Sequence, residues 1–409
     1  MIVVNRHTLS NGLRIIHSQD SATAMVALNI LYNVGSRDEN PEMTGMAHLF
    51  EHLMFGGSEN IPDFDGALEA AGGTNNAWTN CDYTNFYDIV PAHNVETAFW
   101  LESDRMNALA FSDKALEVQR QVVCEEFKQV CLNQPYGDLS HHLNSLAYKV
   151  HPYRYPVIGK ELSHIQKVTQ EDVRQFFYHH YAPNNAVLAI TGNITAERAF
   201  ALAEKWFGPI PSRPIAPRDY LQEPCQTAPR RKSVTGRVPH TVIYKAFHMP
   251  GQHDKLYPVC DTITDILSAG NSSRFYRNLL MKTDLFSKAD ASITGSEEPG
   301  LLLLSGHLRE GVTVEAAEEA LTREALSLVT CPPDEHELER ALNRFESTNT
   351  FSIMNYVPLA AALAQNEMIG RDINDTVKRQ RTTTIESIVE ATQKIITPDN
   401  CSTLIYSPQ

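Results

Sequence analysis

A proline-rich segment divides this chain into two halves that share the same order of predicted elements. Six prolines and the basic run Arg230-Arg231-Lys232 fall between Gly208 and Arg237, a composition typical of a linker. In each half a strand is followed by a polar loop, a helix and a glycine-containing stop. A shift of 213 residues (266 − 53) places Leu53 on Ile266. An internal duplication explains this pattern, and so does chance similarity between two α+β domains. We therefore expect one domain over 1–210, a linker over 211–236 and a second domain over 237–409.

The amino-acid composition limits the kinds of partner that the chain can bind. The 409 residues are 42% hydrophobic and 21% charged, which is ordinary for a globular chain. The formal charge of −14 leaves no basic excess for phosphates, so nucleic acid is excluded as the main partner. Apolar runs stay far below the ~20 residues of a membrane span.

The seven cysteines form no CxxC pair, and free thiols in a reducing compartment are expected. The first residues lack a basic region followed by an apolar one. We expect a cytoplasmic protein, or a periplasmic one if a signal peptide has been removed.

The most informative residues are His48-Leu49-Phe50-Glu51-His52. They lie in a predicted helix over 45–55, with Thr44 as its N-cap and Gly56-Gly57 as its stop. Residues four apart share a helix face, so His48 and His52 can supply two of the three protein ligands of a catalytic Zn²⁺. Glu51 can then reach a water held there, as in the inverted zinc motif H-x-x-E-H. The alternative is a helix with two unrelated surface histidines, which the apolar residues around the motif disfavour.

A third ligand has to come from another segment. The predicted helix over 113–132 carries Glu126 on the same face as Val122 and Val130, together with Val123 and Phe127. A carboxylate on an apolar face needs a partner, and either a metal or a salt bridge to Lys or Arg provides one.

These residues belong to a longer series of motifs in the first 205 residues. The series resembles the pitrilysin or insulinase-type metallopeptidases, which include the mitochondrial processing peptidases. Its members, in order, are Leu9-Ser10-Asn11-Gly12-Leu13, Gly35-Ser36-Arg37-Asp38-Glu39, Gly45-Met46-Ala47-His48, Gly72-Gly73-Thr74-Asn75-Asn76-Ala77 with Thr79, Thr84 and Tyr87, Leu101-Glu102-Ser103-Asp104-Arg105-Met106, His151-Pro152-Tyr153, Pro156-Val157-Ile158-Gly159 and Tyr181-Ala182-Pro183-Asn184-Asn185.

The resemblance implies one Zn²⁺ per chain, bound by His48, His52 and Glu126, with Glu51 as the general base. It also implies an α+β fold of two homologous domains, each a mostly antiparallel sheet with helices packed on it, arranged as a clamshell around a cavity. Small members of the family pair two such chains, so we expect a homodimer or a heterodimer with a paralogous subunit.

Two departures from the family pattern affect the expected site. The family has a Glu seven residues before the third ligand, which supports a metal ligand without binding the metal. Here that position is Gln119, which can hydrogen-bond to a ligand histidine but cannot act as a carboxylate. The family's substrate-clasping Arg and Tyr fall on Leu280 and Ser287. The second repeat places Asp261, Thr264 and Asp265 opposite the motif, so we expect one active site per chain.

Peptide binding is expected at Asn75, Asn76, Ala77 and Tyr87. The resemblance places the first three on an edge strand that accepts an extended peptide by β-augmentation, although the residues alone favour a simple turn.

The hypothesis from sequence is a zinc-dependent endopeptidase that cleaves peptides or unfolded segments inside a chamber. One alternative is an inactive or partner-dependent structural subunit of the same family. The other is a metal-binding peptide carrier, which loss of the Arg/Tyr pair would favour.

Overall fold

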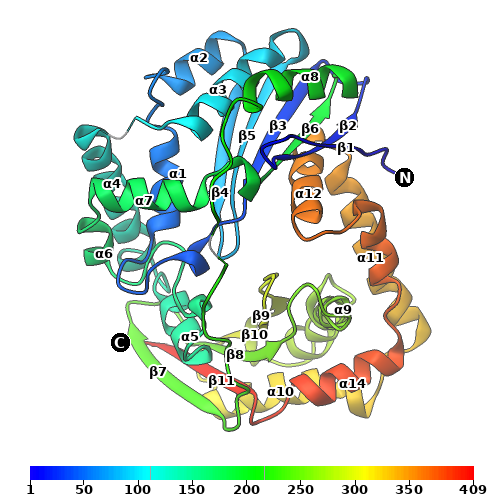
Figure 1. Cartoon of the computed structure of the whole chain (residues 1–409). Helices are drawn as coiled ribbons and strands as arrows, with labels where there is room; N and C mark the ends of the chain where they lie inside the picture. The colour runs from blue at the N-terminus through cyan, green and yellow to red at the C-terminus, as the bar shows by residue number, and fades with distance from the viewer. Residues whose placement is uncertain (111, 216) are drawn as a thin grey trace. The chain divides into compact units, whose positions relative to one another are not determined.

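A computed structural model describes residues 1–110, 112–215 and 217–409 as two compact units (Figure 1). The first contains Met1–Phe127, Tyr155–Tyr220 and Asn349–Asp375, and the second contains Lys128–Arg154, Leu221–Thr348 and Thr376–Gln409. None of the helices in the described ranges is long and apolar enough to span a membrane.

Unit 1 is built on a six-stranded sheet in the order β1-β2-β6-β3-β5-β4. The strands β1 and β2 pair antiparallel and form a hairpin, with Asn11-Gly12 of the first motif between them. Only the β2–β6 pair is parallel, and β4 lies at the edge. The strands are β1 (Asn5–Thr8), β2 (Arg14–Gln19), β3 (Met25–Tyr32), β4 (Thr74–Thr79), β5 (Thr84–Pro91) and β6 (Ala186–Gly192).

Helices cover both faces of this sheet (Figure 1). One face carries most of them, whereas the other packs Ala27 and Leu31 of β3 and Ala189 of β6 against Leu359 and Leu363 of the distant helix α12. The helices are α1 (Met46–Met54), α2 (Phe64–Ala70), α3 (Val95–Asn107), α4 (Asp113–Phe127), α6 (Leu162–Gln166), α7 (Gln170–His180), α8 (Ala196–Phe207) and α12 (Tyr356–Met368).

Unit 2 repeats this topology with one strand fewer. Its sheet has the order β7-β11-β8-β10-β9, and only the β7–β11 pair is parallel. In chain order this pairing matches strands β2 to β6 of unit 1, so the two units share one plan, as the duplication hypothesis requires. The strands are β7 (Arg230–Gly236), β8 (Val242–Met249), β9 (Phe286–Ile293), β10 (Gly300–Leu308) and β11 (Cys401–Pro408).

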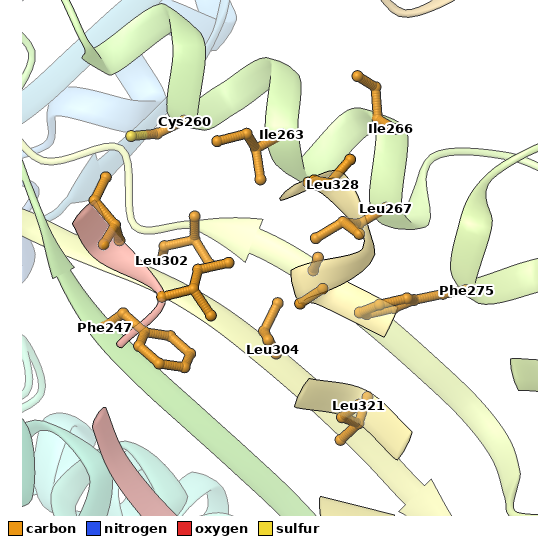
Figure 2. Close-up of a cluster of buried hydrophobic side chains, with 14 of the residues drawn as sticks. Phe247, Cys260, Ile263, Ile266, Leu267, Phe275, Leu302, Leu304, Leu321 and Leu328 are labelled. Carbon is orange, nitrogen blue, oxygen red and sulfur yellow. The ribbon is translucent and has the colours of Figure 1, made fainter. Parts of the chain in front are cut away.

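The core of unit 2 lies between its sheet and a helical layer (Figure 2). Phe247, Leu302 and Leu304 of the sheet pack against helices that include Ile263 and Leu321. The helix α5 packs on the opposite face, on β7, β8 and β11. The helices are α5 (Leu139–Ala147), α9 (Tyr257–Ser268), α10 (Val314–Thr330), α11 (Glu335–Ile353, which ends in unit 1), α13 (Thr376–Gln380) and α14 (Ile385–Ile395).

The units differ from the contiguous ranges expected from sequence. Residues 128–154 group with unit 2 and 349–375 with unit 1, because α5 and α12 bury their apolar faces on those sheets. The expected linker, which includes the undescribed residue 216, also contains the paired strand β7. Between α9 and β9 the chain forms only a short π-type turn, Phe275–Leu280.

Candidate metal centre

The helix α1 begins differently from the sequence prediction. Thr44 is not the N-cap; Gly45 occupies that position, with φ of 88° and no side-chain cap. The carboxylate of buried Glu39 instead accepts hydrogen bonds from the backbone N–H groups of Gly45 and Ala47, both at 2.8 Å. Burial raises the pKa of Glu39 to about 8, against the opposing effect of these N–H donors. Glu39 therefore satisfies helix donors that would otherwise be unpaired.

Close backbone approach explains two glycines of the motif series. A Cβ on Gly45 would lie 3.2 Å from the Cα of Gly159, and a Cβ on Gly159 would lie 3.3 Å from the Cα of Gly45. Both residues have positive φ, which glycine adopts without strain. Thr44 has a different role from capping, because its Oγ1 lies 2.9 Å from Nδ1 of His164 and accepts from the backbone N–H of Lys160. The start of α1 is thus fixed against the segment 158–164.

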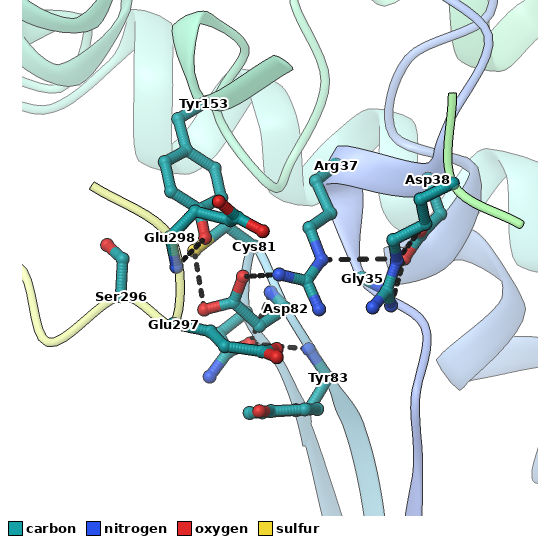
Figure 3. Close-up of polar contacts among 12 residues, drawn as sticks. Gly35, Arg37, Asp38, Cys81, Asp82, Tyr83, Tyr153, Ser296, Glu297 and Glu298 are labelled. Atoms are coloured by element: carbon teal, nitrogen blue, oxygen red, sulfur yellow. Dashed lines mark hydrogen bonds and ion pairs between the residues drawn. The ribbon is translucent and has the colours of Figure 1, made fainter. Parts of the chain in front are cut away.

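The loop that leads to α1 is fixed against the turn between β4 and β5 (Figure 3). The buried guanidinium of Arg37 pairs with Asp82 at 2.9 Å. A Cβ on Gly35 would lie 2.5 Å from the carbonyl of Cys81, so only glycine permits this contact. Glycine and arginine of the motif Gly35-Ser36-Arg37-Asp38-Glu39 therefore have structural roles next to the candidate centre.

The three predicted metal ligands converge. One ligand atom from each of His48, His52 and Glu126 lies within 4.8 Å of the others. Oε2 of Glu126 is 3.7 Å from Nε2 of His48 and 3.4 Å from Nε2 of His52. Bonds of 2.0–2.1 Å in a tetrahedral zinc site place neighbouring ligand atoms about 3.4 Å apart, so this spacing fits Zn²⁺.

The protonation of the two histidines also fits a metal. Burial lowers the pKa of both His48 and His52, against the opposing attraction of Glu126. Neutral imidazoles are the form that binds metals. The side chains of His48, His52 and Glu126 are 14%, 25% and 37% exposed, so the centre is open on one side.

Glu51 is held next to this cluster by strand β4. Its Oε2 accepts a hydrogen bond of 2.5 Å from Oγ1 of Thr79. Burial raises the pKa of Glu51, and the nearby Glu126 raises it further, whereas the Thr79 hydroxyl lowers it. A raised pKa suits a carboxylate that must accept and return a proton near neutral pH. The predicted site omitted Thr79, although this residue stands in a quoted motif.

The surroundings of Glu126 differ from those expected. Val122 and Val130 are 45% and 40% exposed, so the expected apolar face over these residues is wrong. The buried side of α4 consists of Leu116, Val123, Cys124 and Phe127. Glu126 therefore lies at the edge of the buried side of α4, and from there its carboxylate faces both histidines.

Gln119 lies two helical turns before Glu126 and is half-buried. Among the described residues no hydrogen bond joins its amide to either histidine. Within the same ranges Nδ1 of His48 is buried without a hydrogen-bond partner.

The predicted peptide-binding residues lie on an edge strand and its neighbour, not in a simple turn. Asn76 of β4 is paired with Tyr87 of β5, and β4 has no second neighbour in the described sheet. Asn75 donates to Asp65 of α2, and Thr79 reaches α1, so alternate residues of β4 face the helices that carry the centre.

The positions expected for the substrate-clasping Arg and Tyr carry Leu280 and Ser287, which have neither a cationic nor a phenolic side chain. Leu280 packs against the core of unit 2, and the Ser287 hydroxyl donates to the carbonyl of His307. The positions opposite the motif carry no histidine, and α9 presents Asp261 and Asp265 there.

Comparison with known proteins agrees with the geometry. Residues 14–161 match the insulinase (peptidase M16) family, and residues 167–345 match the peptidase M16 inactive domain. The chain belongs to this family of zinc metallopeptidases and their relatives. The zinc protease PqqE of Helicobacter pylori is 28% identical over 320 residues, which cover 77% of this chain and 72% of that protein. A protein named uncharacterized zinc protease YmxG, of Bacillus subtilis, is 22% identical over 98% of both chains.

The fold agrees as well. The crystal structure of a protease from Helicobacter pylori superposes with a TM-score of 0.93 over all of both chains, at 24% identity. The two-domain α+β architecture predicted from the sequence is therefore confirmed.

Proposed function

We propose that this chain is a zinc-dependent endopeptidase that cleaves peptides or unfolded segments. His48, His52 and Glu126 would hold the metal, and Glu51 would act as the general base. The observation that carries the proposal is the convergence of these three ligands from two helices, with Glu51 hydrogen-bonded beside them. The names of the relatives support zinc as the metal.

Bound zinc would supply Lewis acidity, which polarises a scissile carbonyl and favours attack by water near neutral pH. The chain's own residues would move the proton. Glu51 would take it from the attacking water and return it to the leaving amine. Thr79 would keep the Glu51 carboxylate oriented during both transfers, because its hydroxyl donates to Oε2.

The open edge of β4 is the place that we propose for the substrate. An extended peptide could add there as a further strand, with main-chain hydrogen bonds to 74–79. Such binding is largely independent of side chains, and it would place the peptide beside the helix that carries Glu51.

Hydrolysis of a mixed fluorogenic peptide library tests this proposal. We expect activity that a chelator abolishes, that zinc restores and that Glu51→Gln lacks. The matched control is Glu59→Gln, which makes the same change at an exposed residue and should keep full activity. Activity that survives both chelation and Glu51→Gln would exclude the mechanism.

A second candidate is a subunit that is inactive alone and depends on a paralogue. The residues that favour it are Leu280 and Ser287, which cannot clasp a substrate as Arg and Tyr would. This candidate predicts zinc-loaded protein that does not cleave the library until a paralogous chain is added.

A further inference from the structure

Residues 155–220 belong to unit 1, whereas the segments directly before and after them belong to unit 2. Hydrogen bonds join the two segments that flank this excursion of the chain. The segment before it supplies the backbone N–H groups of residues 149–151, and the segment after it supplies the carboxylate of Glu223. A single side chain therefore connects the two ends of the excursion within unit 2.

Three consecutive backbone N–H groups bind this carboxylate. Lys149 donates to both oxygens of Glu223, at 2.8 and 2.9 Å, whereas Val150 and His151 donate to Oε2 at 2.9 and 3.1 Å. The Glu223 side chain is 6% exposed, and Nη1 of Arg230 lies 3.9 Å from its Oε1. Burial raises the pKa of Glu223, but the three N–H groups together outweigh burial and lower it. Glu223 is therefore an anion held in a nest of backbone donors.

The surroundings of this nest are basic. Burial lowers the pKa of Lys149, and the positive charges of Arg230 and Arg154 lower it further. Lys232 has the same effect, whereas the negative charge of Glu223 opposes it. Basic side chains thus gather near the nest, which favours an anion at this place and strengthens the attachment of Glu223.

The segment that carries Glu223 is otherwise weakly attached. Residues 221–229, which we call the strap, lie outside helices and strands, and none of them is buried. Besides Glu223, Gln226 attaches the strap, because its amide donates to the carbonyl of Cys401 at 2.9 Å and accepts from the hydroxyl of Ser402 at 3.1 Å. A segment held by polar contacts with little apolar burial opens at a lower cost than the core does.

Arg218 fixes the chain to unit 1 shortly before the strap. Its Nε donates to Oδ1 of Asp38 at 2.6 Å. Four residues, 219–222, lie between Arg218 and Glu223 (222 − 218). If the strap detaches as far as the start of β7, eleven residues (229 − 218) lie between Arg218 and the sheet of unit 2. The attachment of Glu223 thus decides the length of the free tether between the two units.

We propose that the strap is detachable and that Glu223 is the latch that holds it on residues 149–151. With the latch closed, the ends of the excursion 155–220 are joined and the free tether has four residues. With the latch open, Gln226 is released as well, and the tether lengthens to eleven residues while both sheets stay intact. This device does not depend on the peptidase activity, since none of its residues belongs to the candidate metal centre.

Replacement of Glu223 by alanine in the full chain tests the proposal. Amide hydrogen exchange of residues 149–151 should accelerate at least about tenfold in Glu223→Ala, because their N–H groups lose a charged acceptor. A nitroxide on the exposed Cys225, in a Cys331→Ser background, should change from a restricted to a mobile electron spin resonance spectrum. The unfolding midpoint should stay at the wild-type value, because the sheets keep their contacts.

The matched control is Gln222→Ala, which truncates an exposed side chain of the same segment and should keep slow exchange and a restricted label. Unchanged exchange and a restricted label in Glu223→Ala would overturn the proposal, and so would equal effects of the two substitutions. A lower unfolding midpoint with faster exchange throughout the sheet of unit 2 would also overturn it, because the strap would then be an inseparable part of that unit.

Discussion

Glu126 joins the candidate centre from α4 and lies 74 residues after His52 in the sequence (126 − 52). Its carboxylate lies near both imidazoles. We predict that Glu126→Gln lowers zinc affinity by about 100-fold or more and abolishes cleavage, because an amide is a poor substitute for an anionic ligand. Zinc stoichiometry and isothermal titration measure the loss. The neighbouring, exposed Glu125→Gln should retain zinc, and equal metal loss in both variants would assign the effect to the helix and not to the ligand.

Thr79 is predicted to affect catalysis without affecting metal binding. Thr79→Val removes the hydrogen bond to Glu51, and a bond to a charged group contributes roughly 1.5–3 kcal/mol. We expect kcat to fall about 10- to 100-fold while the zinc content stays at the wild-type level. Thr79→Ser restores the hydroxyl and should recover most of the rate. A Thr79→Val variant with unchanged kcat would show that Glu51 needs no such support.

At the residue scale, spacing along a helix predicts which side chains lie on one face. It does not predict which face of that helix is buried. His48, Glu51 and His52 were identified because residues three and four apart share a helix face. The structure places Glu126 beside both histidines, but the argument from buried Val122 and Val130 was wrong, since both are exposed. Which side of α4 is buried depends on its packing against distant segments, which one sequence does not reveal.

The helices α1 and α9 occupy corresponding places in the two units, but α9 carries Asp261 and Asp265 where α1 carries His48 and His52. The buried Asp261 makes the stability of the protein depend on pH. Burial, and next the proximity of Asp265, raise the pKa of Asp261 to about 6 in α9, although Gln380 donates to it. The folded pKa lies above the unfolded value of 3.8, so the folded state binds the proton more tightly. Stability that is present below pH 4 is therefore lost as the pH rises to about 6.

Asp261→Asn is therefore predicted to stabilise the protein above pH 6. The gain is on the order of 2–3 kcal/mol, since each pKa unit corresponds to 1.36 kcal/mol, and it should vanish near pH 4. Thermal unfolding of wild type and variant between pH 4 and 8 measures it. The fully exposed Asp284→Asn provides the control and should follow wild type at every pH. A variant with lower stability at pH 7.5 would contradict the prediction.

Elements were predicted where their periodicity is strong and missed where it is weak. The helix α1, which was expected over 45–55, spans Met46–Met54 and so was predicted to within one residue at each end. The strand β9 was missed because its sequence, FSKADASI, has a polar and small composition that barely alternates. The basic β7 was assigned to the linker, because its surroundings are rich in proline and only pairing with the distant β11 makes it a strand.

At the scale of the whole molecule, the two-domain plan was predictable but the composition of the units was not. The sequence indicates a boundary near the prolines, and each side does carry its own sheet. However, α12 belongs to unit 1 and α5 to unit 2, although each is encoded in the opposite half. Such an exchange depends on contacts between segments far apart in the sequence, such as Ala147 of α5 with Arg230 of β7, 83 positions apart, for which local patterns give no signal.

This exchange predicts that the two halves do not fold separately. Residues 1–220 alone lack α12, which leaves Ala27, Leu31 and Ala189 uncovered on one face of the sheet. Burial of Leu359 and Leu363 contributes roughly 3–6 kcal/mol, a large part of the 5–15 kcal/mol that stabilises a typical domain.

We expect residues 1–220 to aggregate or to unfold without a cooperative transition, and co-expression with 221–409 to restore soluble protein with the wild-type unfolding midpoint. Limited proteolysis and thermal unfolding of the single and co-expressed fragments measure both outcomes. A cooperative transition of 1–220 alone at the wild-type midpoint would mean that the sheet of unit 1 does not require α12.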